Sequence, residues 1–408
     1  MPQSQLNIMT SGHVDHGKST LVHALTGRFP DTHSEEIKRG ITIKLGYADA
    51  TFRKCEKCAS PYNYTIEKKC PNCGSDTIQT RQVSFVDAPG HETLMATAVA
   101  ASSIVDGALF IIAANELCPQ PQTLEHLLVL QAVGIKNVVI AQTKVDLVTK
   151  EQAVVNYNQI KELLKSTPYD KSPIVPISAV TGTNLSALIY AIETTIPTPV
   201  RDETVAPLMM VARSFDVNKP GTKIKELAGG VLGGAIVKGT LKVGDSIEIM
   251  PGLLIVKKEK ENYKPITTKI TSLNANGKLD SAKPGGLIGV GTLLDPAYTR
   301  ADALVGSVVG LPGSLSPLIN ECNAELKPIV RAGGVKFSEG FVEMEPLVLG
   351  IGTATTVGFV MGKAKGGKGK HVFVLKLKKP VSAKVGDIMA VLRKSGNRWH
   401  FYGTAKVT

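Results

Sequence analysis

The sequence predicts an α/β P-loop domain, with a doubly wound and mostly parallel sheet, followed by two β-barrel domains. A glycine-rich loop with the pattern G-x-x-x-x-G-K-S, residues 12–19, directly follows the apolar run 6–9. Strand-like and helix-like patterns then alternate as far as Ile196, as they do in doubly wound domains. From Pro207 onward, short alternating strands with glycine turns replace that pattern, which is typical of barrels.

The expected elements follow this order along the chain. In the first domain we expect strands at 6–9, 83–86, 138–141 and 174–177, and helices at 19–27, 122–133 and 150–165. In the barrels we expect strands at 208–213, 230–238, 246–250, 266–273, 347–350, 355–361, 371–377 and 388–392. Prolines at 197 and 199 end the first domain, and Pro312-Gly313 marks a second break. The expected domains are 1–200, with a cysteine-rich insert at about 53–76, then 206–315 and 318–408.

The loop after the first strand has the composition of a triphosphate site. Its glycines let backbone amides approach phosphate oxygens, and the Lys18 ammonium adds a positive charge. The Ser19 hydroxyl is suited to Mg²⁺, and the helix that starts here presents its N-terminus to an anion. The sequence therefore predicts nucleotide triphosphate binding.

Two loops follow with the residues that would surround a metal and a γ-phosphate. Asp87 ends an apolar stretch and is followed by Ala-Pro-Gly-His91, as where a strand delivers a carboxylate toward Mg²⁺ and a glycine opens a loop. Earlier, Lys38-Arg-Gly-Ile-Thr42 contains a threonine that is suited to closing over the γ-phosphate and ligating the metal. We expect this earlier segment to be the first switch loop.

Two further loops point to guanine rather than adenine. The strand 138–141 ends at Gln142-Thr-Lys-Val-Asp146, which matches the N-K-x-D motif with Thr143 in place of Asn. The Asp146 carboxylate accepts from two nitrogens on the guanine edge, a pattern that adenine does not offer. The last strand delivers Ser178-Ala179 to the base. Because these elements occur in the correct order, GTP is favoured over ATP.

Four of the six cysteines form two C-x-x-C pairs, Cys55/Cys58 and Cys70/Cys73. Two such turns separated by eleven residues present four thiolates tetrahedrally to Zn²⁺, and four cysteines leave no open position for catalysis. We therefore predict a structural zinc site. Cys118 and Cys322 stand alone and are expected to be small apolar residues.

The net charge of +12 is concentrated in the second half of the chain. The first 200 residues carry 17 Lys and Arg against 18 Asp and Glu, whereas residues 201–408 carry 30 against 17. A positive field attracts phosphate backbones, although lysines also serve solubility alone. The densest cluster, 363–370, has the glycines of a flexible tip that either touches RNA or is solvated.

We expect a soluble cytoplasmic protein. The first residues are polar, so no N-terminal signal is visible. The longest apolar run, near 107–114, is too short to cross a bilayer.

Gly12-His-Val-Asp-His-Gly-Lys18 together with Asp87-Ala-Pro-Gly-His91 resembles the translational GTPase superfamily, to which elongation factor Tu belongs. In that superfamily the histidine after Pro-Gly positions the attacking water. The resemblance therefore implies this role for His91, with Asp15 as a second polar group near the metal.

Three further segments sharpen the resemblance: Ser34 to Tyr47, Arg213 to Thr222, and Pro284 to Gly291. With the cysteine insert, they closely resemble the gamma subunits of archaeal and eukaryotic translation initiation factor 2. The resemblance spans nearly the whole chain. It implies GTP-dependent carriage of methionylated initiator tRNA to the small ribosomal subunit within a heterotrimer, with hydrolysis of GTP to GDP releasing the factor. It also implies that the alpha subunit docks on the second domain and the beta subunit on the GTPase domain.

The resemblance also implies site residues. The catalytic residues would be His91 and Asp15, and the zinc ligands Cys55, Cys58, Cys70 and Cys73. The Mg²⁺ neighbourhood would be Asp15, Ser19, Gly40, Thr42 and, through water, Asp87. The nucleotide would contact Asp15, His16, Gly17, Lys18, Ser19 and Thr20, then Thr143, Lys144, Val145 and Asp146, and finally Ser178, Ala179 and Val180.

The sequence departs from the superfamily pattern at two positions. Ser19 replaces the more usual Thr and keeps the hydroxyl. Thr143 replaces Asn, whose amide normally ties the base loop to the phosphate loop. Since a lost hydrogen bond costs on the order of 1 kcal/mol, we predict weaker nucleotide binding but retained guanine preference through Asp146.

Three alternatives share parts of this pattern. A selenocysteine-specific or other aminoacyl-tRNA-carrying elongation GTPase has the same core and barrels, but neither this cysteine insert nor the Asn218-Lys-Pro-Gly-Thr222 signature is expected there. A GTP-dependent sulfate-activating enzyme subunit would not need strongly basic barrels. A module that holds GTP without turnover would not need Asp15, Thr42 and His91 together.

Overall fold

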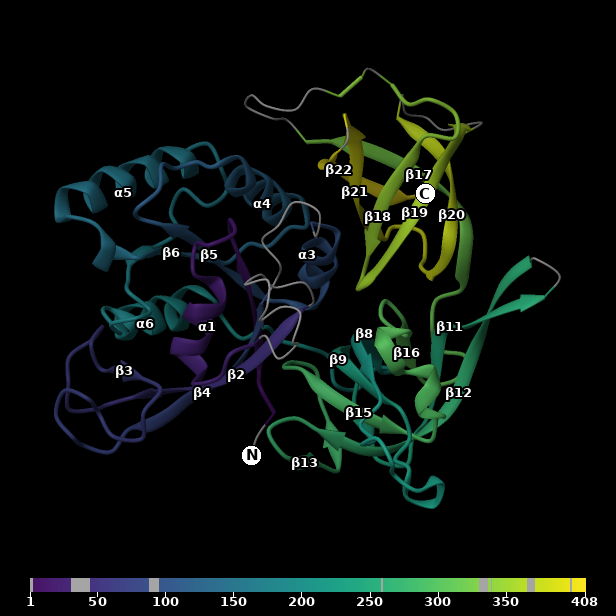
Figure 1. Ribbon diagram of the computed structural model, residues 1–408, viewed down its shortest axis with the longest axis horizontal. Coiled ribbons are helices and arrows are strands. Elements are labelled where there is room, and N and C mark those ends of the chain that lie inside the picture. Colours follow the sequence, from purple (N-terminus) through teal and green to yellow (C-terminus); the bar gives the residue numbers. More distant parts are fainter. Residues whose placement is uncertain are drawn as a thin grey trace. The chain divides into compact units, whose positions relative to one another are not determined.

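The computed structural model describes residues 3–30, 45–87, 95–257, 260–329, 337–338, 340–364, 371–396 and 398–408 (Figure 1). It forms two compact units. One is Ser4–Pro199, and the other is Val200–Thr408 together with the N-terminal Gln3. The predicted fold class is confirmed: an α/β domain is followed by two closed antiparallel barrels. The domain boundaries 1–200, 206–315 and 318–408 stay predictions.

The first unit contains a seven-stranded sheet in the order β3-β2-β4-β1-β5-β6-β7. Its strands are β1 (Leu6–Ser11), β2 (Gly46–Lys54), β3 (Tyr64–Thr65), β4 (Ile78–Asp87), β5 (Gly107–Ala113), β6 (Val138–Thr143) and β7 (Ile174–Pro176). The five strands from β4 to β7 in this order are parallel, whereas β2 and β3 add antiparallel pairings at one edge. Their apolar side chains, such as Ile8, Phe85 and Leu109, are fully buried because helices cover such sheets.

The helices of this unit are α1 (Lys18–Thr26), α3 (Met95–Ala101), α4 (Pro121–Ala132), α5 (Lys150–Leu164) and α6 (Leu185–Thr195), with 3₁₀ turns η2 (Ser102–Ile104) and η3 (Val145–Leu147). Helix α4 begins with a proline, and α5 begins with a capping box in which Thr149 and Gln152 satisfy each other's backbone amides. The three predicted helices begin and end within one or two residues of these bounds. No helix in the described ranges is long and apolar enough to cross a membrane.

The first barrel is formed by β8 (Leu208–Phe215), β9 (Val231–Lys238), β11 (Ser246–Lys257), β12 (Lys260–Asn274), β15 (Ile288–Thr292) and β16 (Val308–Gly310). Pairing of β11 with β12 closes the order β11-β16-β8-β9-β15-β12. Short elements accompany it: β10 (Leu241–Lys242), β13 (Lys278–Leu279), β14 (Ser281–Ala282), η4 (Ile224–Glu226), η5 (Pro296–Tyr298) and η6 (Arg300–Asp302). Met209, Leu232, Ile247 and Val290 belong to its core.

The second barrel closes in the order β17-β20-β19-β18-β21-β22. Its strands are β17 (Leu318–Pro328), β18 (Pro346–Ile351), β19 (Ala354–Lys363), β20 (Val372–Ser382), β21 (Ile388–Ser395) and β22 (Arg398–Val407). Leu326, Leu349, Leu375 and Val391 are among the inward side chains of the core. Alternation of buried and exposed positions along these strands is what barrel closure requires.

The two barrels touch through small residues and one half-buried amine. A Cβ added to Gly306 would lie 2.7 Å from the Ala354 Cα, so only glycine permits this approach. Nearby, the Lys379 Nζ donates to the Val305 carbonyl at 3.4 Å, and burial lowers the pKa of this lysine.

Candidate functional site

The predicted nucleotide-binding segments all follow strands at the carboxyl edge of the parallel sheet. The phosphate loop follows β1, Asp87 ends β4, Thr143 ends β6, and Ser178 lies just beyond β7. Because β1, β4, β6 and β7 run in one direction, their carboxyl ends meet at one edge, where ligands of open α/β sheets bind.

The phosphate loop adopts a conformation that exposes backbone amides. Asp15 has φ 64° and Gly17 has φ 86°, both left-handed, which is the geometry of an anion-binding nest. Gly12 approaches the sheet so closely that a Cβ there would lie 2.3 Å from the Ile111 carbonyl oxygen. The loop can therefore pack this closely against β5 only with glycine at this position.

Lys18 lies within the loop that it is expected to serve. Its side chain is largely buried, and its Nζ donates to the His13 carbonyl at 2.8 Å. An ammonium–phosphate bond is stronger than one to a neutral carbonyl, because both partners are charged. The lysine is therefore suited to exchange this contact for phosphate oxygens.

Ser19 and Asp87 are in contact and are two of the three described residues of the expected Mg²⁺ neighbourhood; the third is Asp15 of the phosphate loop. The Ser19 hydroxyl donates to Asp87 Oδ2 at 2.6 Å, and the Thr10 hydroxyl donates to Oδ1 of the same carboxylate. Asp87 is fully buried at the end of β4. One hydroxyl and one carboxylate side by side are hard oxygen donors, so these residues fit Mg²⁺. Three other expected site residues, Gly40, Thr42 and His91, lie outside the described residues.

Thr143 spans the two loops despite its short side chain. Its hydroxyl donates to the His16 carbonyl at 2.7 Å and is buried. The phosphate loop and the guanine motif are therefore tied by a hydrogen bond, although Asn is absent. We therefore expect Thr143 to weaken nucleotide binding less than its short side chain alone would suggest. Its hydroxyl replaces, in part, the hydrogen bond that an Asn side-chain amide would make.

The two loops expected to bind the base are joined by one backbone hydrogen bond, and the second loop is closed by a bond of its own. The Val145 amide donates to the Ile177 carbonyl at 3.3 Å, and the Thr181 amide donates to the Ser178 hydroxyl at 3.2 Å. Lys144 has φ 59°, a left-handed turn that leaves Asp146 exposed in η3. The exposed carboxylate is thus accessible to a base.

The His16 side chain contacts β5 and not the position expected for phosphate. Its ring is 1% exposed; Nδ1 donates to the Ile111 carbonyl at 2.9 Å, and Nε2 lies 3.3 Å from Glu116 Oε2. Burial lowers the pKa of His16, while the Ile111 carbonyl and the Glu116 carboxylate act in the opposite direction. The side chain therefore anchors the loop, and only its backbone is available to phosphate.

Two polar residues near the phosphate loop, Glu116 and Asn156, were not predicted from the sequence: Glu116 contacts the His16 ring, and Asn156 contacts the Glu116 carbonyl. Glu116 belongs to no motif and follows β5. Asn156 is buried on α5 together with Ile160 and Leu164, at the spacing of one helix face. A polar side chain on an apolar stripe was the available signal for Asn156, and for Glu116 there was none.

The four paired cysteines converge in the segment 55–77, here called the cysteine knuckle. Their sulfurs all lie within 4.8 Å of one another, with 3.6 Å between Cys55 and Cys73 and 3.7 Å between Cys58 and Cys70. A tetrahedral site with Zn–S bonds of about 2.3 Å separates its sulfurs by about 3.8 Å. The donor set therefore fits Zn²⁺.

The thiols of the knuckle differ in acidity. Hydrogen bonds from the Ser75 side chain and backbone lower the pKa of Cys73 to about 6. Hydrogen bonds with Cys73 and then with Cys70 raise the pKa of Cys58 to about 12. Cys73 is thus the more acidic of these two thiols, and a metal that binds Cys58 must displace its proton.

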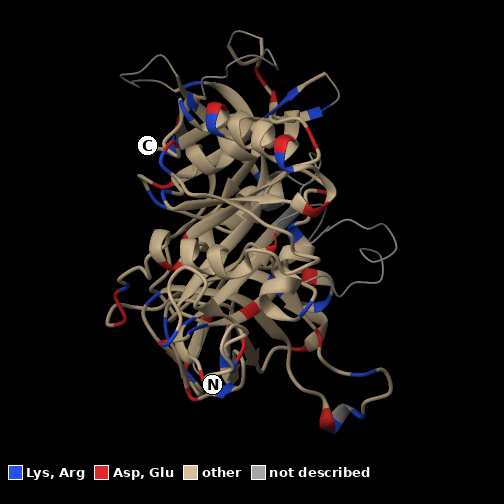
Figure 2. Cartoon of the chain, turned by 90° about the vertical axis from the view of Figure 1, so that its left-hand side faces the viewer, with Lys and Arg blue, Asp and Glu red and all other residues tan. Residues whose placement is uncertain are grey.

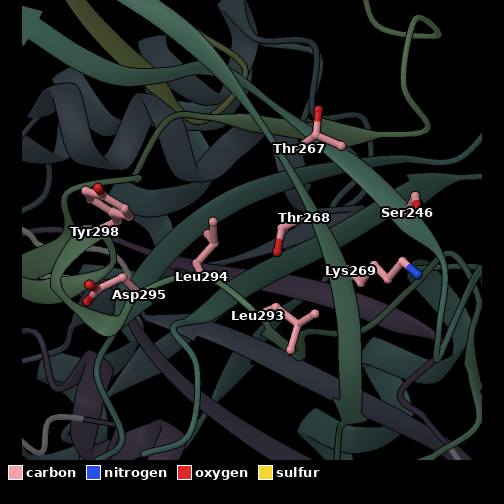
Figure 3. Close-up of a pocket in the computed structure, with 8 residues that line it drawn as sticks. All are labelled: Ser246, Thr267, Thr268, Lys269, Leu293, Leu294, Asp295 and Tyr298. Carbon is pink, nitrogen blue, oxygen red and sulfur yellow. The ribbon is translucent and has the colours of Figure 1, made fainter. Parts of the chain in front are cut away.

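The first barrel carries a shallow pocket of about 530 Å³ (Figure 3). It is lined by Ser246, Thr267, Thr268, Lys269, Leu293, Leu294, Asp295 and Tyr298. Leu293 and Tyr298 are exposed apolar side chains, and Lys269 and Asp295 supply one charge of each sign. Mixed lining of this kind suits a polypeptide surface better than a polyphosphate.

In the cartoon of Figure 2, positions of Lys and Arg are interspersed along the chain with positions of Asp and Glu. The predicted lysine cluster lies mostly outside the described residues, which include Lys363 at the end of β19. The net positive charge of the second half therefore gives no list of RNA contacts.

Two protein families match the chain. Residues 3–198 match the elongation factor Tu GTP-binding domain family, and residues 321–407 match the C-terminal domain family of initiation factor eIF2 gamma. The first match covers the sheet and loops described above, and the second covers the second barrel.

Among similar proteins, translation initiation factor 2 subunit gamma from Methanococcus vannielii is 53% identical over 98% of this chain and 98% of its own. The subunit from Methanocaldococcus jannaschii is 52% identical over 98% of this chain and 97% of its own. The subunit from Pyrococcus abyssi is 51% identical over the same shares.

Among solved structures, a bacterial selenocysteine-specific elongation factor EF-Sec has a TM-score of 0.73 and 25% identity, covering all of this chain and 58% of that one. Elongation factor SelB from Methanococcus maripaludis, in complex with the GTP analogue GppNHp, has a TM-score of 0.72 and 23% identity, covering 79% of that chain. The likeness to SelB shows the shared fold.

Proposed function

Because the chain belongs to the family of translation initiation factor 2 gamma subunits and is a GTPase of that class, we propose that it carries methionylated initiator tRNA in its GTP-bound state. It delivers this tRNA to the small ribosomal subunit, and hydrolysis of GTP to GDP and phosphate releases it. The observation that carries the proposal is the extent of the likeness, since identity above one half spans 98% of the chain, both barrels included.

The nucleotide would be held by the loops at the carboxyl edge of the sheet. Asp15 to Thr20 surround the phosphates, with Lys18 as the cation. Thr143 to Asp146 and Ser178 to Val180 surround the guanine, with Asp146 as the group that selects it. The left-handed turns of the phosphate loop and the tie between Thr143 and His16 support this assignment.

Hydrolysis would require the metal and a positioned water. Asp15, Ser19, Gly40 and Thr42 would surround Mg²⁺, with Asp87 acting through water, and the bound ion neutralises charge that develops on the phosphate oxygens. His91 would orient the attacking water, assisted by Asp15. His91→Ala is expected to lower GTP turnover at least tenfold with little change in GTP affinity, and unchanged turnover would count against the role of His91.

Zinc would be a structural cofactor of the cysteine knuckle. Cys55, Cys58, Cys70 and Cys73 would be its ligands. The sulfur separations support this, because they match a tetrahedral thiolate site without rearrangement. A four-cysteine shell leaves no place for substrate, so the ion would serve folding.

The proposed partners are the tRNA, the ribosomal subunit and two further subunits of a cytoplasmic heterotrimer. The alpha subunit would dock on the first barrel and the beta subunit on the GTPase domain. The pocket beside Leu293 and Tyr298, with its 67% exposed leucine, supports a protein contact on the first barrel. Apolar side chains exposed together favour docking of a polypeptide.

The proposal is tested by titrating the full chain, with its alpha partner, with methionylated initiator tRNA at stated salt. The expected result is tight binding with a non-hydrolysable GTP analogue, weakened by GDP and by removal of the methionine. Equal, weak and salt-sensitive binding in both nucleotide states would reduce the interaction to nonspecific RNA affinity and overturn the proposal.

A parallel titration separates the alternative of a selenocysteine-specific or other elongation GTPase, whose fold the chain shares. Such a protein would prefer a selenocysteinylated or other elongator tRNA over the methionylated initiator. Binding of the methionylated initiator tRNA at least tenfold more tightly than an elongator tRNA supports the initiation role. Tighter binding of the elongator tRNA would replace that role with the elongation one.

A further inference from the structure

A closed path of polar contacts joins the phosphate loop to the guanine motif. The Thr143 hydroxyl donates to the His16 carbonyl at 2.7 Å, and the His16 ring meets Glu116 at 3.3 Å. Asn156 Nδ2 donates to the Glu116 carbonyl at 2.7 Å, and its Oδ1 accepts from Gln142 Nε2 at 2.9 Å. Gln142 and Thr143 are neighbours in the chain, so the path returns to its start.

The members of this path are buried. His16, Gln142, Thr143 and Asn156 are at most 3% exposed, and the Glu116 side chain is 28% exposed at the rim. Buried polar groups are costly when unpaired and restrict motion when every member has a partner. The path therefore holds two loops, more than 120 residues apart in sequence, in one relative position.

Glu116 is held from two directions. Its carboxylate meets the His16 ring, while its backbone carbonyl is fixed by Asn156 of α5. The same Asn156 amide also reaches the Ala113 carbonyl at the end of β5, at 3.3 Å. The segment after β5 is thus a rigid bridge between α5 and the phosphate loop.

We propose that Glu116 and Asn156 are positioning residues that hold the phosphate loop in register with the guanine motif, so that phosphate and base are recognised as one unit. The inference rests on the proposed nucleotide site. Neither residue is expected to touch the nucleotide; each acts through its partner, Glu116 through His16 and Asn156 through Gln142. Loss of either should weaken guanine nucleotide binding even though every contacting residue remains.

The first test compares dissociation rates of a fluorescent GDP from the full chain and three variants. Glu116→Ala should release GDP about tenfold faster, because it removes the carboxylate that lies 3.3 Å from the His16 ring and opens space beside that ring. Glu116→Gln keeps the shape and a hydrogen-bonding group, so it should stay within about threefold of the parent. Glu162→Ala, on the exposed face of α5, is the control and should have no effect.

The second test asks whether Glu116 and Thr143 act through the same histidine. In a double-mutant cycle, GDP release is measured for Glu116→Ala, for Thr143→Ala and for the double variant. The rate increase of the double variant should be clearly smaller than the product of the two single increases. A general loss of stability would not give this result, so thermal unfolding without nucleotide is measured alongside. Multiplicative effects would overturn the coupling.

A second pair of variants covers the case in which Glu116→Ala does not fold. Asn156→Asp replaces the donating amide with an acceptor and should speed GDP release about tenfold, while the exposed Asn158→Asp on the same helix should not. If the parent binds no GDP, the proposed function fails. If the parent binds GDP and neither Glu116 nor Asn156 alters its release, only this inference fails.

Discussion

The nucleotide site and the cysteine knuckle belong to the same unit, but they are held together in opposite ways. The nucleotide site follows the ends of parallel, buried strands, and its loops are joined by direct hydrogen bonds such as that from Thr143 to His16. The knuckle contains only the two-residue β3 and the isolated bridge between Lys69 and Asp76. Its centre is four sulfurs rather than an apolar core.

This difference indicates two relations between ligand and fold. The sheet would form its site before any nucleotide arrives, so nucleotide contributes affinity and little architecture. The knuckle has little regular secondary structure and is centred on four sulfurs, so a bound metal would contribute to its folding free energy directly. Changes in one site should therefore leave the other largely intact, which can be tested.

The largest expected effect is the loss of zinc. Cys55→Ser removes a fully buried ligand, and we expect the single bound ion to be lost because three thiolates hold Zn²⁺ far more weakly than four. Zinc is measured by atomic absorption, and protease sensitivity of residues 55–77 reports local unfolding. GDP affinity should change less than threefold.

Cys322→Ser is the matched control for this experiment, since Cys322 lies in the second barrel and outside the cluster. It should retain zinc. Loss of GDP binding in Cys55→Ser would show that the two sites are not independent.

The next effect concerns the opposite site. Lys18→Ala removes the cation of the phosphate loop, and we expect GDP affinity to fall about 100-fold, since charge-assisted bonds to phosphate are lost. Zinc content should remain unchanged. Calorimetric titration with GDP measures the affinity, and a variant that binds GDP as well as the parent would remove Lys18 from the site.

Acid should release zinc before it weakens the sheet. Without metal, Cys58 has its pKa raised to about 12, so zinc binding must displace at least this proton. Zinc affinity is then favoured by high pH and should fall at least tenfold per unit as pH decreases from 8 to 6. A competition titration with a chromophoric chelator at several pH values measures this slope, and a flat profile would exclude thiolate ligation.

The smallest expected effect is a gain in nucleotide affinity from a substitution in the guanine motif. Thr143→Asn restores the amide typical of the guanine motif and should tighten GDP binding by up to about fivefold, the equivalent of one hydrogen bond. The gain is limited because the Thr143 hydroxyl already reaches His16. A variant that binds GDP no more tightly than the parent would remove the inference that Thr143 weakens the site.

Much of the fold was predictable because apolar periodicity marks strand centres. The predicted strand 266–273 lies inside β12, which extends to Lys260. The added residues include lysines and a glutamate, whose pairing with β11 depends on backbone hydrogen bonds rather than on an apolar pattern. Strand β2, which pairs antiparallel with β4 and lies inside the edge strand β3, was not predicted, although buried and half-buried positions alternate along it.

The residues of the candidate site that belong to short sequence motifs were predictable. The residues that contact each other only through the folded structure, far apart in the chain, were not. The order of Lys18, Asp87 and Asp146 in the chain identifies the nucleotide loops, and the structure places these loops at one sheet edge. The contact between Thr143 and His16 depends on the closeness of two loops that no local pattern relates. The same is true of Glu116, whose partner lies 100 residues away.

The contact between the two barrels has a consequence for how such proteins diversify. Gly306 fits against Ala354 with no room for a Cβ, and the half-buried Lys379 ammonium donates to a carbonyl of the other barrel. A recombination event that separated the barrels would expose a surface shaped only for its neighbour and would require a new partner for this amine. We therefore expect the two barrels to be inherited as a pair, and grafts of a single barrel to need compensating changes at this seam.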